Sequence, residues 1–494
     1  MKHQNHPLNP FNDSRRAFLR RSAQLALTGT ALPMIPMALN LAAMGEAAAF
    51  NATDYKALVC IFLYGGCDYA NTVVTYDDPS YNLYSAIRGG GAAQGAGGIA
   101  LAKEDLTTTL LEPNTPLPNG RQYAFHPAMT GLASLFNAGK VAVQLNVGPL
   151  VVPLTKAQYK SSDRVTYPLP PKLFSHNDQQ SIWQSSSPEG STIGWGGNLG
   201  DLAIASGANS NSLFTCVNVT GNAVFLSGDS ALSYQVSTKG AVAVNGVKSN
   251  VYGSSAVKTA LSQLVQQSRS HVLENEYNRV TARAITSEAQ ITGALAGVTL
   301  GTVFPTDNSL ADQLKMVARL IGARNALGAK RQVFLVSLTG FDLHDNLVSN
   351  QATLLAKVSE AMSAFYNATV ELGVANSVTS FTASDFGRTL TSNGDGSDHG
   401  WGSHHWVMGG AVKGKEFYGT APPVSVSDTS AAADQWHVGQ GRLLPTTSVD
   451  QYAATLANWF GVSDAEIAGI LPNLRRFGVA AGRPDYPTNL GFLA

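Results

Sequence analysis

The stretch ALVCIFLY at residues 57–64 is a continuous apolar run that ends at Gly65 and Gly66. Such a run predicts a β-strand that is buried on both faces of a parallel sheet. Three more runs of this kind follow along the chain, and a helical pattern precedes each one. These strands are predicted at 141–147, 332–338 and 377–383, and their helices at 127–138, 310–327 and 351–372. The alternation predicts an α/β fold, a three-layer sandwich with a mostly parallel central sheet.

Two segments interrupt this alternation. Residues 89–98 (GGGAAQGAGG) predict a flexible glycine loop. Residues 192–301 contain polar short strands and then two helical patterns, and we interpret them as a cap region inserted into a main domain that spans 50–494. The strands are predicted at 214–219 and 223–226, and the helices at 256–278 and 281–296.

Residues 1–49 have the features of a bacterial export signal. A twin-arginine pattern, SRRAFLR at 14–20, precedes a modestly apolar stretch at 23–43 and three alanines at 47–49. We predict export of the folded chain by the twin-arginine machinery, cleavage after residue 49, and a location in the periplasm or outside the cell. A membrane anchor or an amphipathic helix is the alternative, but prolines interrupt the apolar stretch. No later run of about 18 apolar residues occurs, so no membrane span is predicted after signal removal.

The composition limits the partners of the chain. It has 33 basic and 33 acidic residues, and charged residues make up 13% where about 25% is usual. Without its first 49 residues it keeps 28 basic and 31 acidic residues. Such a chain lacks the basic surface that nucleic acid requires, so no nucleic-acid partner is predicted. Three cysteines are too few for a disulfide framework or a thiolate zinc site, although Cys60 and Cys67 could in principle pair.

Polar residues follow three of the four predicted strands. Asp68 follows the first strand and Asp385 the fourth, while Asp342 and His344 follow the third. Ligands of open α/β sheets bind outside the carboxyl ends of the strands, where carboxylates from several strands can meet at one metal ion. A single aspartate at such a place is often only a turn former or a helix cap. Three strand ends together predict a shared polar site.

A glycine-rich segment at 395–405, DGSDHGWGSHH, adds imidazole groups to these carboxylates. Its glycines allow the backbone to bend side chains inward, and a mixture of carboxylate and imidazole suits divalent metal ions. We predict that this segment supplies metal ligands from Asp398, His399, His404 and His405. The alternative is a surface loop whose histidines are satisfied without a metal.

Ser175 is the candidate nucleophile. In FSHNDQQ at 174–180, Ser175 and Asp178 have the spacing of a helix N-cap and an acid three residues later, before a helix predicted to run to about residue 185. A hydroxyl there would stand at the positive end of the helix, beside an anionic group of a substrate. A plain helix cap is the other interpretation, and His176 or Asp178 could be the functional group instead. Arg388 is a candidate anion clamp, with a surface salt bridge as its alternative.

Six motifs give nearly the whole chain after residue 49 a resemblance to a known family. With the twin-arginine start they resemble the uncharacterised bacterial domain-of-unknown-function 1501 family, which is similar to the alkaline phosphatase and sulfatase superfamily. Those α/β enzymes hold one or two divalent metals at strand ends and use a Ser, Thr or formylglycine nucleophile. The motifs are LVCIFLYGGCDYANTVV (58–74), FSHNDQQSIWQ (174–184), GFDLHDN (340–346), FTASDFGRT (381–389), GSDHGWGSHHWVMGGAVKG (396–414) and GRLLPTTSVDQYAATLANWFGV (441–462).

The resemblance implies roles for individual residues. Asp68 would match the first-strand metal ligand, Asp342 and His344 an Asp-and-His pair, Asp385 the late strand-end Asp, His399 the last metal His, and Ser175 the nucleophile. The chain also departs from the superfamily, because Phe386 follows Asp385 where His or Asn is usual. The spacing from Asp342 to His344 is shorter than usual, and CDYAN at 67–71 replaces the sulfatase signature. These departures favour one retained metal, or a site rearranged around 398–405.

The leading hypothesis is an exported metal-dependent hydrolase of the alkaline phosphatase and sulfatase type. Its substrate would be a small anionic ester of phosphate or sulfate, or a surface glycan. A divalent ion of zinc, calcium, magnesium or manganese would stabilise developing charge, with Ser175 or a metal-activated water attacking. The alternative is a non-catalytic secreted protein that retains the fold and acts in binding or surface assembly, and Phe386 favours it.

Overall fold

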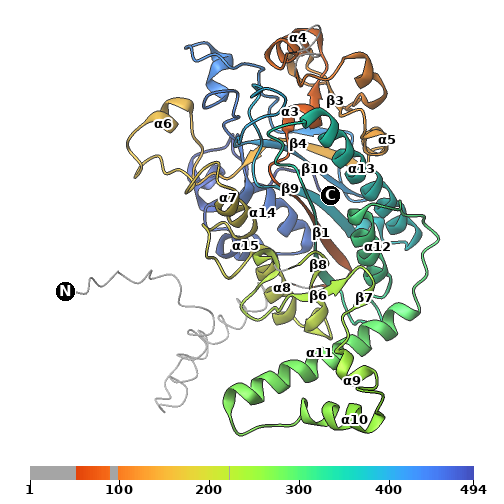
Figure 1. Cartoon of the computed structure of the whole chain (residues 1–494). Coiled ribbons are helices and arrows are strands. Elements are labelled where there is room, and N and C mark those ends of the chain that lie inside the picture. The colour runs from red at the N-terminus through yellow and green to blue at the C-terminus, as the bar shows by residue number, and fades with distance from the viewer. Residues whose placement is uncertain (1–49, 51, 90–97, 222) are drawn as a thin grey trace, which may run out of the picture. The chain divides into compact units, whose positions relative to one another are not determined.

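In a computed structural model of the chain, residues 50, 52–89, 98–221 and 223–494 are described (Figure 1). The predicted export signal at 1–49 and most of the predicted glycine loop lie outside the described residues. Phe50–Ala494 form one unit. Within the described ranges, no helix combines the length and the apolar character that crossing a membrane requires.

The four predicted strands are confirmed, and all of them belong to one ten-stranded sheet. β1 is central and pairs in parallel with β8 on one side and β9 on the other. The strand order is β11-β4-β10-β9-β1-β8-β5-β6-β7, with β12 paired to β4. The chain therefore has the predicted α/β fold with a mostly parallel central sheet. The four strands are β1 (Lys56–Tyr64), β4 (Val141–Gly148), β8 (Arg331–Thr339) and β9 (Val378–Ser384).

Of the other strands, β10 lies inside this sheet, five extend its edges, and two form a separate pair. β10 runs antiparallel to both of its neighbours, β4 and β9. β2 and β3 form a separate antiparallel pair. These strands are β2 (Val73–Thr75), β3 (Tyr123–Phe125), β5 (Cys216–Asn218), β6 (Tyr234–Ser237), β7 (Gly240–Ala241), β10 (Ser403–Gly409), β11 (Phe417–Tyr418) and β12 (Thr447–Ser448).

The central strand is buried on both faces, as its apolar run predicts. Val59 and Ile61 point into one hydrophobic cluster, while Cys60 and Phe62 point into the other. The first cluster lies against α5 (Thr130–Asn137), α12 (Ser309–Gly322) and α13 (Leu347–Glu371), and the second against α8 (Trp195–Ala205) and α14 (Val449–Phe460) (Figure 1). Helices therefore cover both faces of the sheet, which makes three layers.

The remaining helices are shorter or lie outside these layers. They are α3 (Tyr69–Thr72), α4 (Asp78–Ile87), α6 (Lys156–Lys160), α7 (His176–Ser185), α9 (Asn245–Lys248), α10 (Ser255–Leu264), α11 (Val272–Ala296) and α15 (Asp464–Ile470). The predicted helix that begins at 176 is confirmed by α7.

The segment at 192–301 contributes to the sheet itself. β5 pairs in parallel with β8, and β6 pairs with β5, so the segment extends one edge of the sheet. The two predicted helices differ from the observed ones, because the chain breaks after α10 and then runs as one helix of 25 residues in α11. The second predicted short strand is a 3-10 turn at Val224–Leu226. That this segment acts as a cap stays a prediction.

β10 lies where the sequence predicts part of a glycine-rich segment, so this prediction was wrong for residues 403–405. The strand SHHWVMG is buried along its whole length between β4 and β9. Because side chains alternate along a strand, the adjacent His404 and His405 face opposite sides of the sheet. The strand begins with three polar residues, so it lacks the continuous apolar run that marks the other central strands.

The three cysteines are all free and buried, so the possible pairing of Cys60 with Cys67 does not occur. Burial raises the pKa of the Cys67 thiol to about 12 and that of Cys216 to about 12. Neutral buried thiols of this kind act as small apolar side chains.

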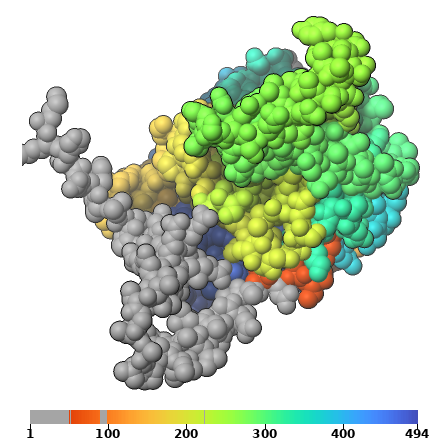
Figure 2. All heavy atoms as spheres, turned by 90° about the horizontal axis from the view of Figure 1, so that it is seen from below, coloured from red at the N-terminus to blue at the C-terminus, as the bar shows by residue number. Residues whose placement is uncertain are grey.

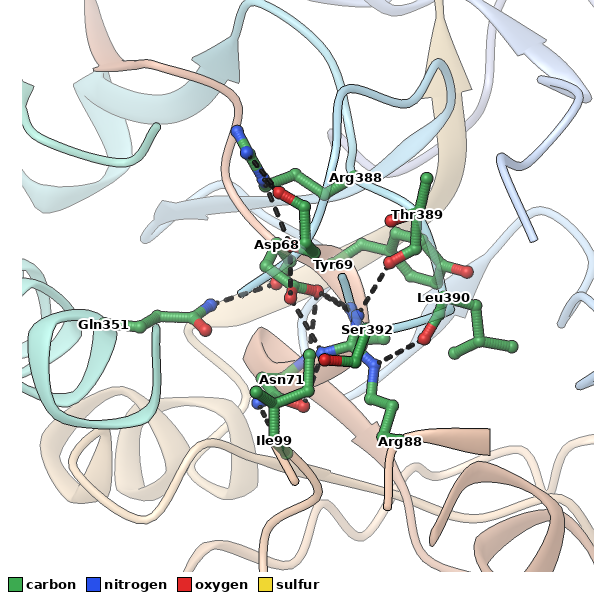
Figure 3. Close-up of polar contacts among 12 residues, drawn as sticks. Asp68, Tyr69, Asn71, Arg88, Ile99, Gln351, Arg388, Thr389, Leu390 and Ser392 are labelled. Carbon is green, nitrogen blue, oxygen red and sulfur yellow. Dashed lines mark hydrogen bonds and ion pairs between the residues drawn. The ribbon is translucent and has the colours of Figure 1, made fainter. Parts of the chain in front are cut away.

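A buried ion pair fixes the segment that follows β1 (Figure 3). Arg88 Nη1 lies 2.7 Å from Asp68 Oδ2, and the two side chains are 0% and 1% exposed. Arg88 also donates to the backbone carbonyls of Thr389 and Leu390. Asp68 accepts a hydrogen bond from the Ala70 amide at the start of α3. A buried charge is tolerated only when it is paired in this way.

We expect Asp68→Ala to lower the free energy of unfolding by about 3–5 kcal/mol, because it leaves the Arg88 guanidinium buried without a counter-charge. Urea unfolding of the purified chain measures this. The matched control is Asp78→Ala, whose side chain is 82% exposed in its pair with Lys103 and contributes about 0–1 kcal/mol. Equal losses in the two variants would contradict the prediction.

Candidate metal centre

The candidate site lies where β1, β8 and β9 end beside one another. Gly65 and Gly66 follow β1 with φ angles of 117° and 85°, which favour glycine. A Cβ atom on Gly65 would lie 2.3 Å from the Asp342 amide nitrogen. The glycine therefore lets the segments after β1 and β8 approach closely enough to build one site.

Asp385 anchors the site from the end of β9. Its side chain is fully buried, with 0% exposure. Oδ1 accepts from the Gly65 amide at 3.1 Å, and Oδ2 lies 2.7 Å from both His176 Nδ1 and Gln180 Nε2. His176 and Gln180 are one turn apart on α7, so they share a face of the helix. The carboxylate thus fixes α7 to the ends of β1 and β9.

Three imidazoles face the carboxylate of Asp342. His176 Nε2 lies 3.3 Å from Oδ2, while His344 Nε2 and His399 Nε2 lie 3.1 and 3.2 Å from Oδ1. Ligand atoms about 2.1 Å from a tetrahedral metal ion lie about 3.4 Å from one another. His176, Asp342 and His399 could hold a metal ion, since their ligand atoms all lie within 4.8 Å of one another.

The second nitrogen of each imidazole contacts an oxygen. His176 Nδ1 lies 2.7 Å from Asp385 Oδ2, and His399 Nδ1 lies 2.8 Å from the Phe174 carbonyl oxygen. His344 Nδ1 lies 3.3 Å from Asp398 Oδ1. A carbonyl or an ionised carboxylate can only accept, so these contacts place a proton on each Nδ1, and Nε2 is the nitrogen that faces Asp342 and could bind a metal ion. Metal-binding histidines show this second contact almost always.

The protonation of the cluster follows from its neighbours. The hydrogen bond to Asp385 raises the pKa of His176 above its usual range. Burial lowers the pKa of His399. Burial alone would raise the pKa of Asp342, but the hydrogen bond and the charge of Arg388 outweigh it and lower the pKa. Asp342 is therefore held as a carboxylate.

Arg388 is bound by protein acceptors in this arrangement, and its role as an anion clamp stays a prediction. Its side chain is 0% exposed, and Nη1 donates to Asp342 Oδ1 at 2.8 Å and to the Gly65 carbonyl at 3.0 Å. Nε and Nη2 donate to the Ser397 carbonyl. Protein acceptors thus engage every nitrogen of the guanidinium.

Ser175 occupies the N-cap position of α7, as predicted, but its hydroxyl does not cap the helix. It donates instead to Asp178 Oδ2 at 3.0 Å, and Lys172 Nζ lies 3.5 Å from the same oxygen. The role of Ser175 as a nucleophile stays a prediction.

Phe174 aligns two of the imidazoles through its backbone. Its φ of 72° lies in the left-handed region, where a bulky residue is strained by about 1–3 kcal/mol. The carbonyl of Phe174 accepts from His399, and His176 follows two residues later. Arg442 lies 5.4 Å from the Phe174 ring and donates to the His399 carbonyl. No sequence pattern marks this contact, since it depends on a backbone carbonyl.

Phe386 forms an apolar wall of the site. Its ring lies 4.8 Å from the His176 ring and 4.7 Å from the His399 ring, between centroids. A Cβ atom on Gly66 would lie 2.5 Å from the Phe386 ring, so the glycine makes room for it. The residue thus packs against both imidazoles.

Three of the predicted metal ligands lie away from this cluster. Asp68 is paired with Arg88. His404 Nδ1 accepts from the Asn146 amide, and the His404 ring packs against Tyr69. His405 follows His404 on β10, so it faces the opposite side of the sheet, where its ring packs against Trp183. Asp398 reaches the cluster only through its contact with His344. The sequence grouped these residues because they are close along the chain, but strand alternation and burial separate them.

The sequence matches the family described as "Protein of unknown function (DUF1501)" over residues 55–471, so the chain belongs to that family. It matches no curated protein.

Two solved structures are distantly similar to the chain. One is the lipoteichoic acid synthase LtaP from Listeria monocytogenes, with 10% identity and a TM-score of 0.31 over 85% of this chain and 74% of that one. The other is the PsFucS1 sulfatase from Pseudoalteromonas sp., with 9% identity and a TM-score of 0.34 over 87% of this chain and 74% of that one.

The histidines of β10 predict a pH dependence of stability. Burial lowers the pKa of His404 to about 3 and that of His405 to about 3. Below a pH of about 6.5 the unfolded chain protonates both residues while the folded chain keeps them neutral, so stability falls with pH by at most about 1.4 kcal/mol per unit for each histidine.

We expect His405→Phe to show a smaller loss of stability than the wild type between pH 6.5 and pH 4, measured by urea unfolding. His405 Nε2 has no hydrogen-bond partner among the described residues, so the change removes only the 3.3 Å contact between Nδ1 and Thr382 Oγ1. The control is His271→Phe at an exposed position before α11, which should retain the wild-type slope. Equal slopes in all three proteins would contradict the prediction.

Proposed function

We propose that the chain is an exported metal-dependent hydrolase of anionic esters, in which His176, Asp342 and His399 hold one divalent metal ion. The observation that carries this proposal is the contact pattern of the imidazoles. Each Nδ1 contacts an oxygen acceptor while each Nε2 faces Asp342. Three Nε2 atoms that converge beside a carboxylate need positive charge between them, which protons or a cation can supply, and a divalent metal ion on His176, Asp342 and His399 would supply it.

The donor set favours some metals over others. Two imidazoles and one carboxylate suit zinc or manganese, whereas calcium and magnesium prefer oxygen ligands alone. Catalytic zinc sites have three protein ligands and one open position. We therefore narrow the predicted cofactors from zinc, calcium, magnesium or manganese to zinc or manganese.

When bound, the metal would act as a Lewis acid that stabilises negative charge on the ester. Asp385 holds the His176 ring, and Arg388 keeps Asp342 ionised, so these residues prepare the site without touching the substrate. His344 is 45% exposed and its Nδ1 contacts Asp398, so we assign to its Nε2 the transfer of a proton to or from the substrate. Ser175 is the proposed nucleophile, and its hydroxyl must leave Asp178 to attack.

We propose a substrate that is a phosphate or sulfate ester, either small or part of a surface glycan. The resemblance of the strand-end motifs to the alkaline phosphatase and sulfatase superfamily supports this class. Export of the folded chain by the twin-arginine machinery to the periplasm or the medium would place the protein beside such substrates.

A non-catalytic binding or surface-assembly protein is the second candidate. The observation that favours it is that Arg388 and Ser175 are both engaged by protein groups, which leaves neither free for a substrate. In that case the metal would have a structural role.

We expect His176→Ala and His399→Ala each to weaken zinc binding at least a hundredfold, because each removes a ligand. Asp385→Asn should weaken it by about 10–100-fold, since it disturbs the second contact of a ligand. Isothermal titration of metal-free protein measures these affinities. The control is His271→Ala, at an exposed histidine outside the site. Wild-type affinity in the ligand variants would contradict the proposed metal site.

We expect the metal-loaded protein to hydrolyse an aryl phosphate or an aryl sulfate, and His344→Gln to lower kcat by about 10²–10⁴ while zinc affinity stays within about tenfold. A steady-state assay with both esters, before and after chelation, measures this. Ser175→Ala should abolish turnover. If the wild type binds zinc but is no faster than His399→Ala, the binding protein is the correct alternative.

A further inference from the structure

One part of the described chain packs against few other residues and leaves many of its side chains exposed. We define the projection as residues 232–286, in which the edge strands β6 and β7 join the sheet, and α9, α10 and the first half of α11 extend beyond it (Figure 1, Figure 2). α10 has no buried residue. α11 is anchored by Ile291 and Leu295, which are 0% and 5% exposed, whereas Leu273 and Tyr277 nearer its start are 74% and 68% exposed.

Exposed apolar side chains concentrate in this projection. Leu264, Leu273 and Tyr277 line an open groove of about 600 Å³ between the end of α10 and the start of α11. Ten of the fifteen large apolar residues that are exposed in the described chain lie in the projection, so they are not scattered over the surface. They are Leu232, Val242, Val244, Tyr252, Val257, Leu264, Val272, Leu273, Tyr277 and Val280.

α10 would be more stable if another surface buried its apolar face. It has 10 residues, whereas isolated helices shorter than about 12–15 residues are marginal in water. Val257, Leu261 and Leu264 follow one another at spacings of four and three, which places them on one face. A helix of this length with an apolar face gains stability when that face is buried.

The charge of the projection differs from that of the rest of the chain. It has two acidic residues, Glu274 and Glu276, whereas residues 50–494 as a whole have more acidic than basic residues. In the described chain no carboxylate lies within ion-pair distance of four of its six basic residues. The six are Lys239, Lys248, Lys258, Arg269, Arg279 and Arg283, of which Lys248 and Arg279 are paired.

The projection has both exposed apolar side chains and excess positive charge. A matching partner therefore offers an apolar interior for the side chains and anionic groups at its surface. A second copy of the chain would bring two positive projections together, which like charges oppose. A lipid bilayer with anionic headgroups accepts apolar side chains at its interface and attracts each nearby lysine or arginine. We propose that the projection binds the surface of an anionic lipid bilayer, so that the protein works at a membrane. This inference is independent of the metal site.

Sedimentation of the full chain with lipid vesicles tests the proposal. We expect binding to vesicles of phosphatidylcholine with phosphatidylglycerol, weaker binding at high salt, and little binding to phosphatidylcholine alone. Leu273→Ser/Tyr277→Ser and Lys258→Gln/Arg269→Gln should each lower the partition coefficient at least tenfold. The controls change matched groups outside the projection, Val303→Ser/Val370→Ser and Lys315→Gln/Lys413→Gln, and should bind like the wild type.

Several results would overturn the proposal. Equal binding by all variants would place the contact outside the projection, including residues 1–49. Absence of vesicle binding by the wild type would also refute it. A dimer in sedimentation velocity that the projection variants abolish, without lipid binding, would assign the surface to a second copy. Unchanged urea-unfolding curves in the variants exclude misfolding as the cause of lost binding.

Discussion

The site depends on the buried carboxylate of Asp385. A fully buried charge costs several kcal/mol unless hydrogen bonds satisfy it. Asp385 obtains these bonds from the Gly65 amide and from His176 and Gln180. The same bonds attach α7 to the sheet and hold the His176 ring with Nε2 toward Asp342. One desolvated charge thus determines where a helix docks and how a candidate ligand is oriented.

Because the chain has few charged residues, a cluster of ionisable groups indicates a function more strongly than it would in a highly charged chain. With 13% charged residues, the protein has few ionisable groups to place anywhere. It gathers Asp342, Asp385 and three imidazoles at the ends of adjacent strands. The fully buried Arg388 donates to Asp342, so its positive charge keeps this candidate ligand ionised. Such a concentration is hard to explain by solvation alone, because surface groups need no common focus.

The sequence predicted the parts of this site that follow from strand periodicity. Apolar runs located β1, β4, β8 and β9, and their ends located Asp342, His344 and Asp385. The sequence did not predict which charged residues pair in the folded chain. Asp68 and Arg88, for example, are 20 residues apart, and no local pattern marks them as partners. The proposed ligand role of His176 depends on how α7 packs against the ends of β1 and β9. His404 is close to His399 in the sequence, but it is buried on β10 with its ring against Tyr69, away from the cluster.

X-ray absorption spectroscopy of the zinc-loaded protein tests the central claim most directly. The account predicts a first shell with two imidazole nitrogens and one carboxylate oxygen at about 2.0–2.2 Å. It also predicts that the imidazole signal is lost in a His176→Ala/His399→Ala variant. A first shell without imidazole, or an unchanged spectrum in that variant, would contradict the account.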